Sequence, residues 1–257
     1  PGAAVFTERV SGRTHALVMV LPPSDGAPGP VLPREATFVV DTSGSMSGVS
    51  IVQAKEATQF AISRLQPGDR FNVIEFNSGT RALFPEPMPV DPATIAAAGK
   101  FVAGLKANGG TEMKPALAAA LAPRTLPGYA RQVFFLTDGA VGNEHELLKL
   151  IRAQLGDRRL YTIAIGPAPN AWFIRKAAQF GRGTSTFIGD VRDVRERMTT
   201  LFAKLERPAL TDLSITWPVG AEVYPHELPD LYAGEPIVAA ASFAGAPQTL
   251  SVVGRRG

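Results

Sequence analysis

Three short, almost continuous apolar runs constrain the fold of this chain more than any other feature. They are Ala36–Val40, Val133–Thr137 and Leu160–Ile165. A strand that is apolar on both faces has to be covered on both faces, as in a parallel sheet between two layers of helices. Apolar residues at helical spacing stand between these runs. We therefore expect an α/β fold with a doubly wound, mainly parallel sheet flanked by helices.

The segments around these runs complete the pattern. Residues 70–76 and 184–188 predict further strands. Helices are predicted over residues 51–65, 95–105, 147–155 and 190–206, the last with Asp190 as its N-cap. A sheet of this kind binds ligands beyond the carboxyl ends of its strands, so the loops at that edge form the candidate site.

Both ends of the chain differ from its middle. Residues 4–21 predict two strands, residues 210–254 predict three or four, and neither end has a helical pattern. We expect an N-terminal β segment at residues 1–33, an α/β domain at 34–207 and a C-terminal β region at 208–257. The flanking β-rich region is then built from both termini. Because the chain starts at Pro1 and not at Met, we also expect the natural polypeptide to be longer at both ends.

The composition excludes several classes of protein. With 45% hydrophobic and 19% charged residues, the chain can bury a substantial core. The net charge is only +3 and basic residues do not form a stripe with aromatics, which argues against a nucleic-acid partner. There is no apolar run of membrane-spanning length, so we expect no membrane insertion by this segment. The absence of cysteine excludes disulfides and thiolate ligands.

A loop rich in serine and glycine, Asp41–Gly48, follows the first apolar run. A phosphate-binding loop would need a lysine that this segment lacks, and Asp41 would repel phosphate. A nucleophile elbow needs a serine at the centre of GxSxG, but Met46 occupies that position. None of the three histidines lies in a strand-end loop of the core, which argues against a Ser-His-Asp triad. The simplest alternative is a polar turn that caps the next helix.

Two other loops belong to the same edge of the predicted sheet. Asn108–Met113 precedes a helix expected at Pro115–Leu121, and Asp138-Gly139 follows the run Val133–Thr137. Because the carboxyl ends of parallel strands meet at one edge, oxygen-bearing side chains of the three loops can converge there. These side chains are Asp41, Ser43, Ser45, Thr111 and Asp138.

The spacing DxSxS, followed by Thr111 and Asp138, resembles the metal-ion-dependent adhesion site of the von Willebrand factor A family. The resemblance covers about residues 36–205 and implies a Rossmann-like sheet. It implies that Ser43, Ser45 and Thr111 bind a divalent cation directly, and that Asp41 and Asp138 bind it directly or through water. All of these are hard oxygen ligands, which suit Mg²⁺, Mn²⁺ or Ca²⁺ and not a typical zinc site.

The resemblance also implies how a partner binds. Few carboxylates would touch the ion, so it would stay electrophilic, and an Asp or Glu of a partner protein could complete its coordination. Residues placed to touch such a partner are Met46, Asn77, Ser78, Glu112, Met113 and Val141. Each could equally be an ordinary exposed loop residue, and Glu112 could instead pair with Lys114 or Arg81. We expect Trp172 and Trp217 to pack in the interior or between domains.

Longer phrases indicate a branch of the family. Gln66–Ile74 and Gly109–Met113 resemble the inter-alpha-trypsin inhibitor heavy-chain group and its bacterial relatives. Phe6–Arg9 and Val223–Pro236 resemble the β regions that flank the A domain in that group. The resemblance implies an extracytoplasmic location, at a bacterial cell surface or in the periplasm.

The sequence therefore favours a metal-dependent protein-binding module for adhesion or assembly, and not an enzyme. One alternative is a scaffold domain whose metal only stabilises the fold, which predicts stabilisation by metal without capture of an acidic ligand. Another is a non-catalytic subunit of a larger assembly. The sequence leaves the partner and the oligomeric state open.

Overall fold

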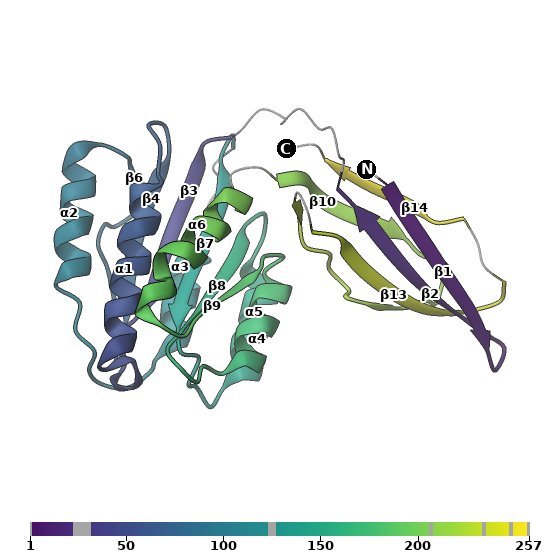
Figure 1. Ribbon diagram of the computed structural model, residues 1–257, viewed down its shortest axis with the longest axis horizontal. Coiled ribbons are helices and arrows are strands. Elements are labelled where there is room, and N and C mark those ends of the chain that lie inside the picture. Colours follow the sequence, from purple (N-terminus) through teal and green to yellow (C-terminus); the bar gives the residue numbers. More distant parts are fainter. Residues whose placement is uncertain are drawn as a thin grey trace. The chain divides into compact units, whose positions relative to one another are not determined.

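The computed structural model describes residues 2–22, 32–122, 127–205, 208–232, 235–246 and 249–255. The chain divides into two compact units (Figure 1). One is Leu32–Phe202, and the other joins Pro1–Val31 to Ala203–Gly257. No helix within the described ranges is long and apolar enough to cross a membrane.

The larger unit contains a seven-stranded sheet in the order β5-β4-β3-β7-β8-β9, with β6 also paired to β4. The strands β3, β4, β7, β8 and β9 are parallel, and β5 and β6 run antiparallel to β4. Their bounds are β3 Arg34–Asp41, β4 Arg70–Phe76, β5 Thr80–Ala82, β6 Met88–Pro89, β7 Ala130–Thr137, β8 Arg159–Ile165 and β9 Ser185–Ile188. Every residue of β3 and β8 is buried, as their apolar runs predict. The predicted fold class is confirmed.

Helices flank this sheet, and their bounds are α1 Val49–Ser63, α2 Pro92–Ala103, α3 Met113–Ala120, α4 Glu144–Gln154, α5 Ala171–Phe180 and α6 Val194–Leu205. Short 3₁₀ turns at Gly44–Met46 and Val191–Asp193 precede α1 and α6. Asp190 caps the second of these turns by accepting a hydrogen bond from the Arg192 N–H. The helix expected from Asp190 therefore starts with a 3₁₀ turn, and its expected last residue, 206, lies outside the described residues.

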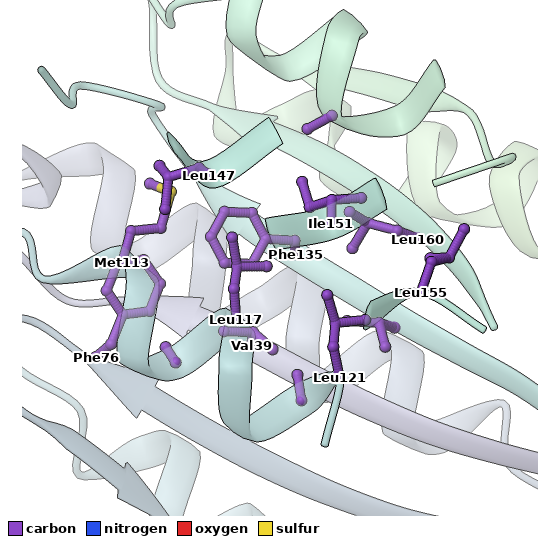
Figure 2. Packing of buried hydrophobic residues seen from close by; sticks show 14 of the residues in the cluster. Val39, Phe76, Met113, Leu117, Leu121, Phe135, Leu147, Ile151, Leu155 and Leu160 are labelled. Carbon is purple, nitrogen blue, oxygen red and sulfur yellow. The ribbon is translucent and has the colours of Figure 1, made fainter. Parts of the chain in front are cut away.

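Neighbouring residues of the same strand point to opposite faces of the sheet. On one face, the strands pack against α3, α4 and α5 (Figure 2). Residues in this core include Val39, Phe76, Met113, Leu117, Phe135, Leu147, Ile151 and Phe173. The strand alternation sends the preceding residues, Phe38 and Phe134, to the other face. There their rings stack, and Phe202 of α6 stacks on Phe134 with ring centroids 5.3 Å apart. The sheet is thus covered by apolar side chains on both faces.

The smaller unit is a pair of sheets with the strand orders β1-β2-β13-β11 and β12-β10-β14. Its strands are β1 Gly2–Val10, β2 Arg13–Leu21, β10 Pro208–Thr216, β11 Glu222–Tyr224, β12 Leu231–Tyr232, β13 Ile237–Ala244 and β14 Ser251–Arg255. Val18 and Ile237 of one sheet share a buried cluster with Leu213 and Leu231 of the other. The predicted β-rich region from both termini is confirmed.

Among its described residues the C-terminal part holds five strands, and not the three or four expected. β11 and β12 have only three and two residues, which is too short to produce a readable alternation. Trp217 is partly buried and packs against the core of this unit, as expected.

Candidate metal centre

The loop after β3 is tied to the loop between α2 and α3 at the carboxyl edge of the larger sheet. The Asn108 N–H donates to the Thr42 carbonyl at 2.8 Å, and the Gly44 N–H donates to the Gly109 carbonyl at 3.0 Å. A Cβ on Gly44 would lie 3.2 Å from that carbonyl oxygen, tighter than most such contacts. Glycine at position 44 therefore lets the loop after β3 approach the loop before α3.

Asp41, the last residue of β3, is fully buried at this edge. One carboxylate oxygen accepts a hydrogen bond from the Ser43 N–H at 2.8 Å. The other accepts one from the Thr137 hydroxyl at 2.5 Å. Burial raises the pKa of Asp41 above its usual value, and the negative charge of Asp138 raises it further, while the hydrogen bonds from Ser43 and Thr137 act in the opposite direction. Asp41 and Asp138 therefore both bring negative charge to this edge of the sheet.

The hydroxyls of the same loop lie together. The Oγ atoms of Ser43 and Ser45 are 3.1 Å apart, with Ser43 buried and Ser45 exposed. Asp138 is partly buried, and one of its carboxylate oxygens accepts a hydrogen bond from the Ala140 N–H at 3.0 Å. Thr111, also partly buried, lies on the loop that Gly109 ties to the end of β3. The structure therefore brings Asp41, Ser43, Ser45 and Asp138 together and places Thr111 on the adjoining loop.

This set of side chains fits a hard divalent cation. No lysine, arginine or histidine among the described residues forms an ion pair with Asp41 or Asp138. The described ranges also contain no group of three or more His, Cys, Asp or Glu side chains placed for a metal, which argues against a zinc-type site. Two carboxylates with neighbouring hydroxyls are oxygen ligands suited to Mg²⁺, Ca²⁺ or Mn²⁺.

Two residues predicted to face a partner are buried instead. Met46, the last residue of the 3₁₀ turn Gly44–Met46, is fully buried. Met113, the first residue of α3, is 1% exposed. Figure 2 shows Met113 within the core between the sheet and α3. Burial of a methionine side chain stabilises the fold by about 1.5–3 kcal/mol relative to leaving it exposed. Met46 and Met113 are therefore core residues and do not face a partner, contrary to the prediction.

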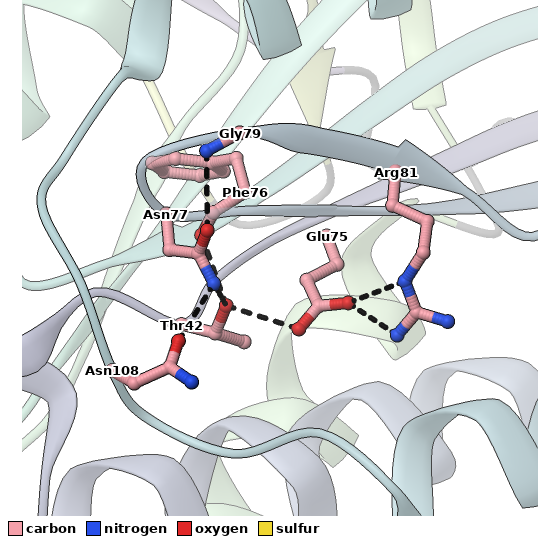
Figure 3. A network of polar contacts seen from close by, with 7 residues as sticks. All are labelled: Thr42, Glu75, Phe76, Asn77, Gly79, Arg81 and Asn108. Atoms are coloured by element: carbon pink, nitrogen blue, oxygen red, sulfur yellow. Dashed lines mark hydrogen bonds and ion pairs between the residues drawn. The ribbon is translucent and has the colours of Figure 1, made fainter.

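Two other predicted contact residues brace the loops. Asn77 is partly buried and donates through its side-chain amide to Thr42 Oγ1 at 3.2 Å and to Asn108 Oδ1 at 3.0 Å (Figure 3). Ser78 is exposed, and its hydroxyl accepts a hydrogen bond from the Gly110 N–H at 2.7 Å. Both side chains thus hold neighbouring loops in register, whatever else they contact.

Glu112 is exposed and Val141 is partly buried. Neither ion pair considered for Glu112 forms. Lys114 pairs with Glu146, and Arg81 pairs with Glu75. Glu112 therefore remains available at the rim of the site.

Sequence analysis did not identify three polar residues near the site, Thr137, Thr42 and Glu75. Thr137 bridges the two loops, because its hydroxyl donates to Asp41 and accepts from the Gly139 N–H at 2.9 Å. Thr42 links Asn77 to Glu75 (Figure 3). The Thr42 hydroxyl accepts a hydrogen bond from the Asn77 side-chain amide and donates one to the Glu75 carboxylate at 3.2 Å. The sequence does carry a signal for Glu75, since a carboxylate in a predicted strand needs partners when it is buried.

Trp172 corrects another expectation. It was expected to pack in the interior or between domains, and its 50% exposure on the first turn of α5 excludes the interior. Its ring lies 5.9 Å from that of His145, on the first turn of α4. The Asn170 N–H just before α5 donates to the Asp138 carbonyl at 2.8 Å, so this aromatic pair lies near the rim of the candidate centre.

Comparison with known proteins gives one family. The family model described as von Willebrand factor type A domain matches residues 34–187. The human protein named von Willebrand factor A domain-containing protein 5B1 is 30% identical over 209 residues, which are 79% of this chain and 17% of that protein. A von Willebrand factor A domain-containing protein of Dictyostelium discoideum is 30% identical over 190 residues, which are 74% of this chain and 20% of that protein. The chain thus spans about a fifth of the length of these relatives.

Solved structures show the same fold. A von Willebrand factor type A structure from Catenulispora acidiphila has a TM-score of 0.75 at 22% identity, and the match covers 100% of this chain and 70% of that one. The manganese-loaded TRAP protein of Plasmodium vivax has a TM-score of 0.54 at 15% identity, covering 93% of this chain and 82% of that one. None of these likenesses separates the inter-alpha-trypsin inhibitor heavy-chain branch from the rest.

Proposed function

We propose that this chain, which belongs to the von Willebrand factor type A domain family, is a divalent-cation-dependent protein-binding module. Domains of this family generally mediate protein–protein interaction and adhesion. In the proposal, Mg²⁺, or Ca²⁺ or Mn²⁺ in its place, is held at the carboxyl edge of the sheet. The partner presents an Asp or Glu side chain to the ion. The proposal assigns this site binding and no catalysis.

The burial of Asp41 beside Asp138 is the observation that carries this proposal. An ionised carboxylate is costly to bury without a counter-charge, and a second carboxylate nearby adds to that cost. Within the described ranges no basic side chain pairs with either residue. A divalent cation would supply the missing charge and remove both costs.

The neutral hydroxyls explain why the bound ion would accept a partner. Ser43, Ser45 and Thr111 would supply oxygens without charge, and only Asp41 and Asp138 would supply negative charge. When bound, the ion offers a Lewis-acidic position for an incoming carboxylate. Ser45 is exposed while Asp41 is buried, so the solvent-facing side of the site is the side open to a partner.

The first test compares two serines of the same loop. Ser45→Ala removes a proposed ligand hydroxyl, and Ser47→Ala removes an exposed hydroxyl outside the DxSxS pattern. At a hundredfold excess over Kd, an ion bound only by the folded state stabilises it by about 2.7 kcal/mol. We expect Mg²⁺ to raise the melting temperature of the wild type and of Ser47→Ala, and much less that of Ser45→Ala. Equal shifts in the two variants would contradict the site.

A second measurement separates adhesion from a scaffold role. Binding of a blocked peptide with one aspartate is followed by calorimetry with Mg²⁺ and with chelator, and an asparagine peptide serves as control. Capture only of the aspartate peptide, and only with Mg²⁺, supports the binding module. Stabilisation by Mg²⁺ without capture would instead identify a scaffold whose metal is structural. An extracytoplasmic location is part of the same proposal, and fractionation of the source cells tests it.

A further inference from the structure

A polar pocket of about 440 Å³ opens beside the candidate metal centre. Glu75 of β4, Arg81 of β5, Asn77 between them, and Lys106 and Asn108 of the loop before α3 line it. The pocket adjoins the centre directly, because Asn77 hydrogen-bonds both to Asn108 and to Thr42 (Figure 3). Thr42 stands between Asp41 and Ser43 in the chain.

The charges of this pocket do not cancel. Glu75 is buried, and its carboxylate is neutralised by Arg81, which donates through Nε at 2.9 Å and Nη2 at 2.5 Å. The Arg81 guanidinium also lies over the Phe101 ring, 4.4 Å from its centroid, which holds it in place. Lys106 is exposed and has no carboxylate partner among the described residues. One positive charge is therefore left over.

The hydrogen-bonding groups of the pocket favour the same kind of ligand. The side-chain oxygen of Asn108 already accepts from Asn77, so its amide nitrogen is directed away from the network (Figure 3). Lys106 offers only donors, and Arg81 has a further nitrogen, Nη1, beyond those bound to Glu75. Donors with a net charge of one suit a monoanionic carboxylate better than a doubly charged phosphate.

We infer that this pocket binds a second carboxylate of the partner segment whose first carboxylate reaches the metal, an inference that rests on the proposed function. In an extended peptide, residues two positions apart point to the same side and are roughly 7 Å apart. Asn77 lines the pocket and donates a hydrogen bond to Thr42 of the metal loop, so the pocket and that loop are neighbours. The partner is then an acidic peptide with two Asp or Glu residues close in sequence.

The test uses two blocked pentapeptides and saturating Mg²⁺. One carries aspartates at positions two and four between glycines, and in the other the second aspartate is asparagine. Calorimetry gives the ratio of their affinities for the whole chain and for two variants. Lys106→Ala removes the free charge of the pocket, and Lys100→Ala removes an exposed lysine of α2 that does not line the pocket. A solvent-accessible ion pair is worth up to about 1 kcal/mol, or about fivefold in affinity.

We expect the ratio in the wild type and in Lys100→Ala to exceed that in Lys106→Ala by about fivefold. A peptide with two aspartates can place either one on the metal, and this advantage is the same in Lys106→Ala, so it cancels when the ratios are compared. Equal ratios in all three proteins would overturn the second subsite while leaving the metal site intact. Loss of Mg²⁺-dependence for the one-aspartate peptide would instead remove the proposed function. If inorganic phosphate alone perturbs the Lys106 amide resonance more strongly than the two-aspartate peptide does, the pocket is a free-anion site and the inference is wrong.

Discussion

Thr137 offers the sharpest test of how the fold holds the acidic site. Its side chain is fully buried at the end of β7, where the hydroxyl donates to Asp41 and accepts from the Gly139 N–H. Thr137→Val keeps the shape of the side chain and removes both hydrogen bonds. Asp41 then loses its side-chain link to the loop that carries Asp138, while β3 and β7 stay paired.

The magnitude follows from the two lost contacts. A hydrogen bond to a charged group contributes about 1.5–3 kcal/mol, and a buried N–H left without an acceptor costs about 1–3 kcal/mol. The added methyl group recovers part of this, so we expect Thr137→Val to lower the free energy of unfolding by about 3 kcal/mol. Residues that orient metal ligands typically change affinity about 10–100-fold, so we expect Mg²⁺ affinity to fall at least about tenfold.

Thr162→Val is the matched control. Thr162 is also fully buried in a strand of the same sheet, but its hydroxyl donates to the neutral Ile174 carbonyl at 3.0 Å. Loss of such a bond costs about 1 kcal/mol. Urea unfolding without metal gives the stability of each variant, and calorimetric titration gives its Mg²⁺ affinity. If both variants lose the same stability and both keep wild-type Mg²⁺ affinity, Thr137 does not position Asp41 and the reasoning fails.

Two further predictions concern ion pairs away from the centre. Arg34 donates to Asp69 through Nε at 3.0 Å and Nη2 at 2.8 Å, and both side chains are buried. Arg34→Ala should lower the free energy of unfolding in urea by about 3–5 kcal/mol, and a loss below about 1 kcal/mol would mean that water compensates the charge of Asp69. Hydrogen bonds from Arg192 lower the pKa of Asp190 to about 2. This pair stabilises the fold above the ordinary Asp pKa and ceases to do so as the pH falls towards 2. Arg192→Ala removes the side-chain hydrogen bonds and keeps the one from the backbone N–H, so it should raise the Asp190 pKa towards its ordinary range in an NMR titration. An unchanged pKa would assign the whole shift to the backbone of the turn.

Much of the fold could be predicted because its signals are local. The apolar run at residues 36–40 specifies a strand covered on both faces, whatever the neighbouring strands are. Asp41, Ser43 and Ser45 follow that strand within a single loop, so chain connectivity alone keeps them close together. Strand order was not needed to place them at the carboxyl edge.

Side-chain direction and choice of partner depended on the tertiary structure. Met113 and Glu112 are adjacent in sequence, yet one packs into the core and the other faces solvent, because α3 starts at Met113 and directs its first residue towards the sheet. Lys114 pairs with Glu146 because α3 packs beside α4, and the residues are 32 positions apart. No local pattern encodes that neighbour, so the sequence did not indicate Glu146 as the partner of Lys114.

The hydrogen bond from Thr137 to Asp41 also depended on both sequence and tertiary structure. The sequence by itself determined that Asp41 and Asp138 each directly follow an apolar run predicted to be a buried strand. Only the tertiary structure decided that Thr137 would hold Asp41, since the two residues are 96 positions apart and meet because β3 pairs with β7. Pairing of parallel strands is set by the packing of whole helices against the sheet, which is a long-range property that no single segment carries.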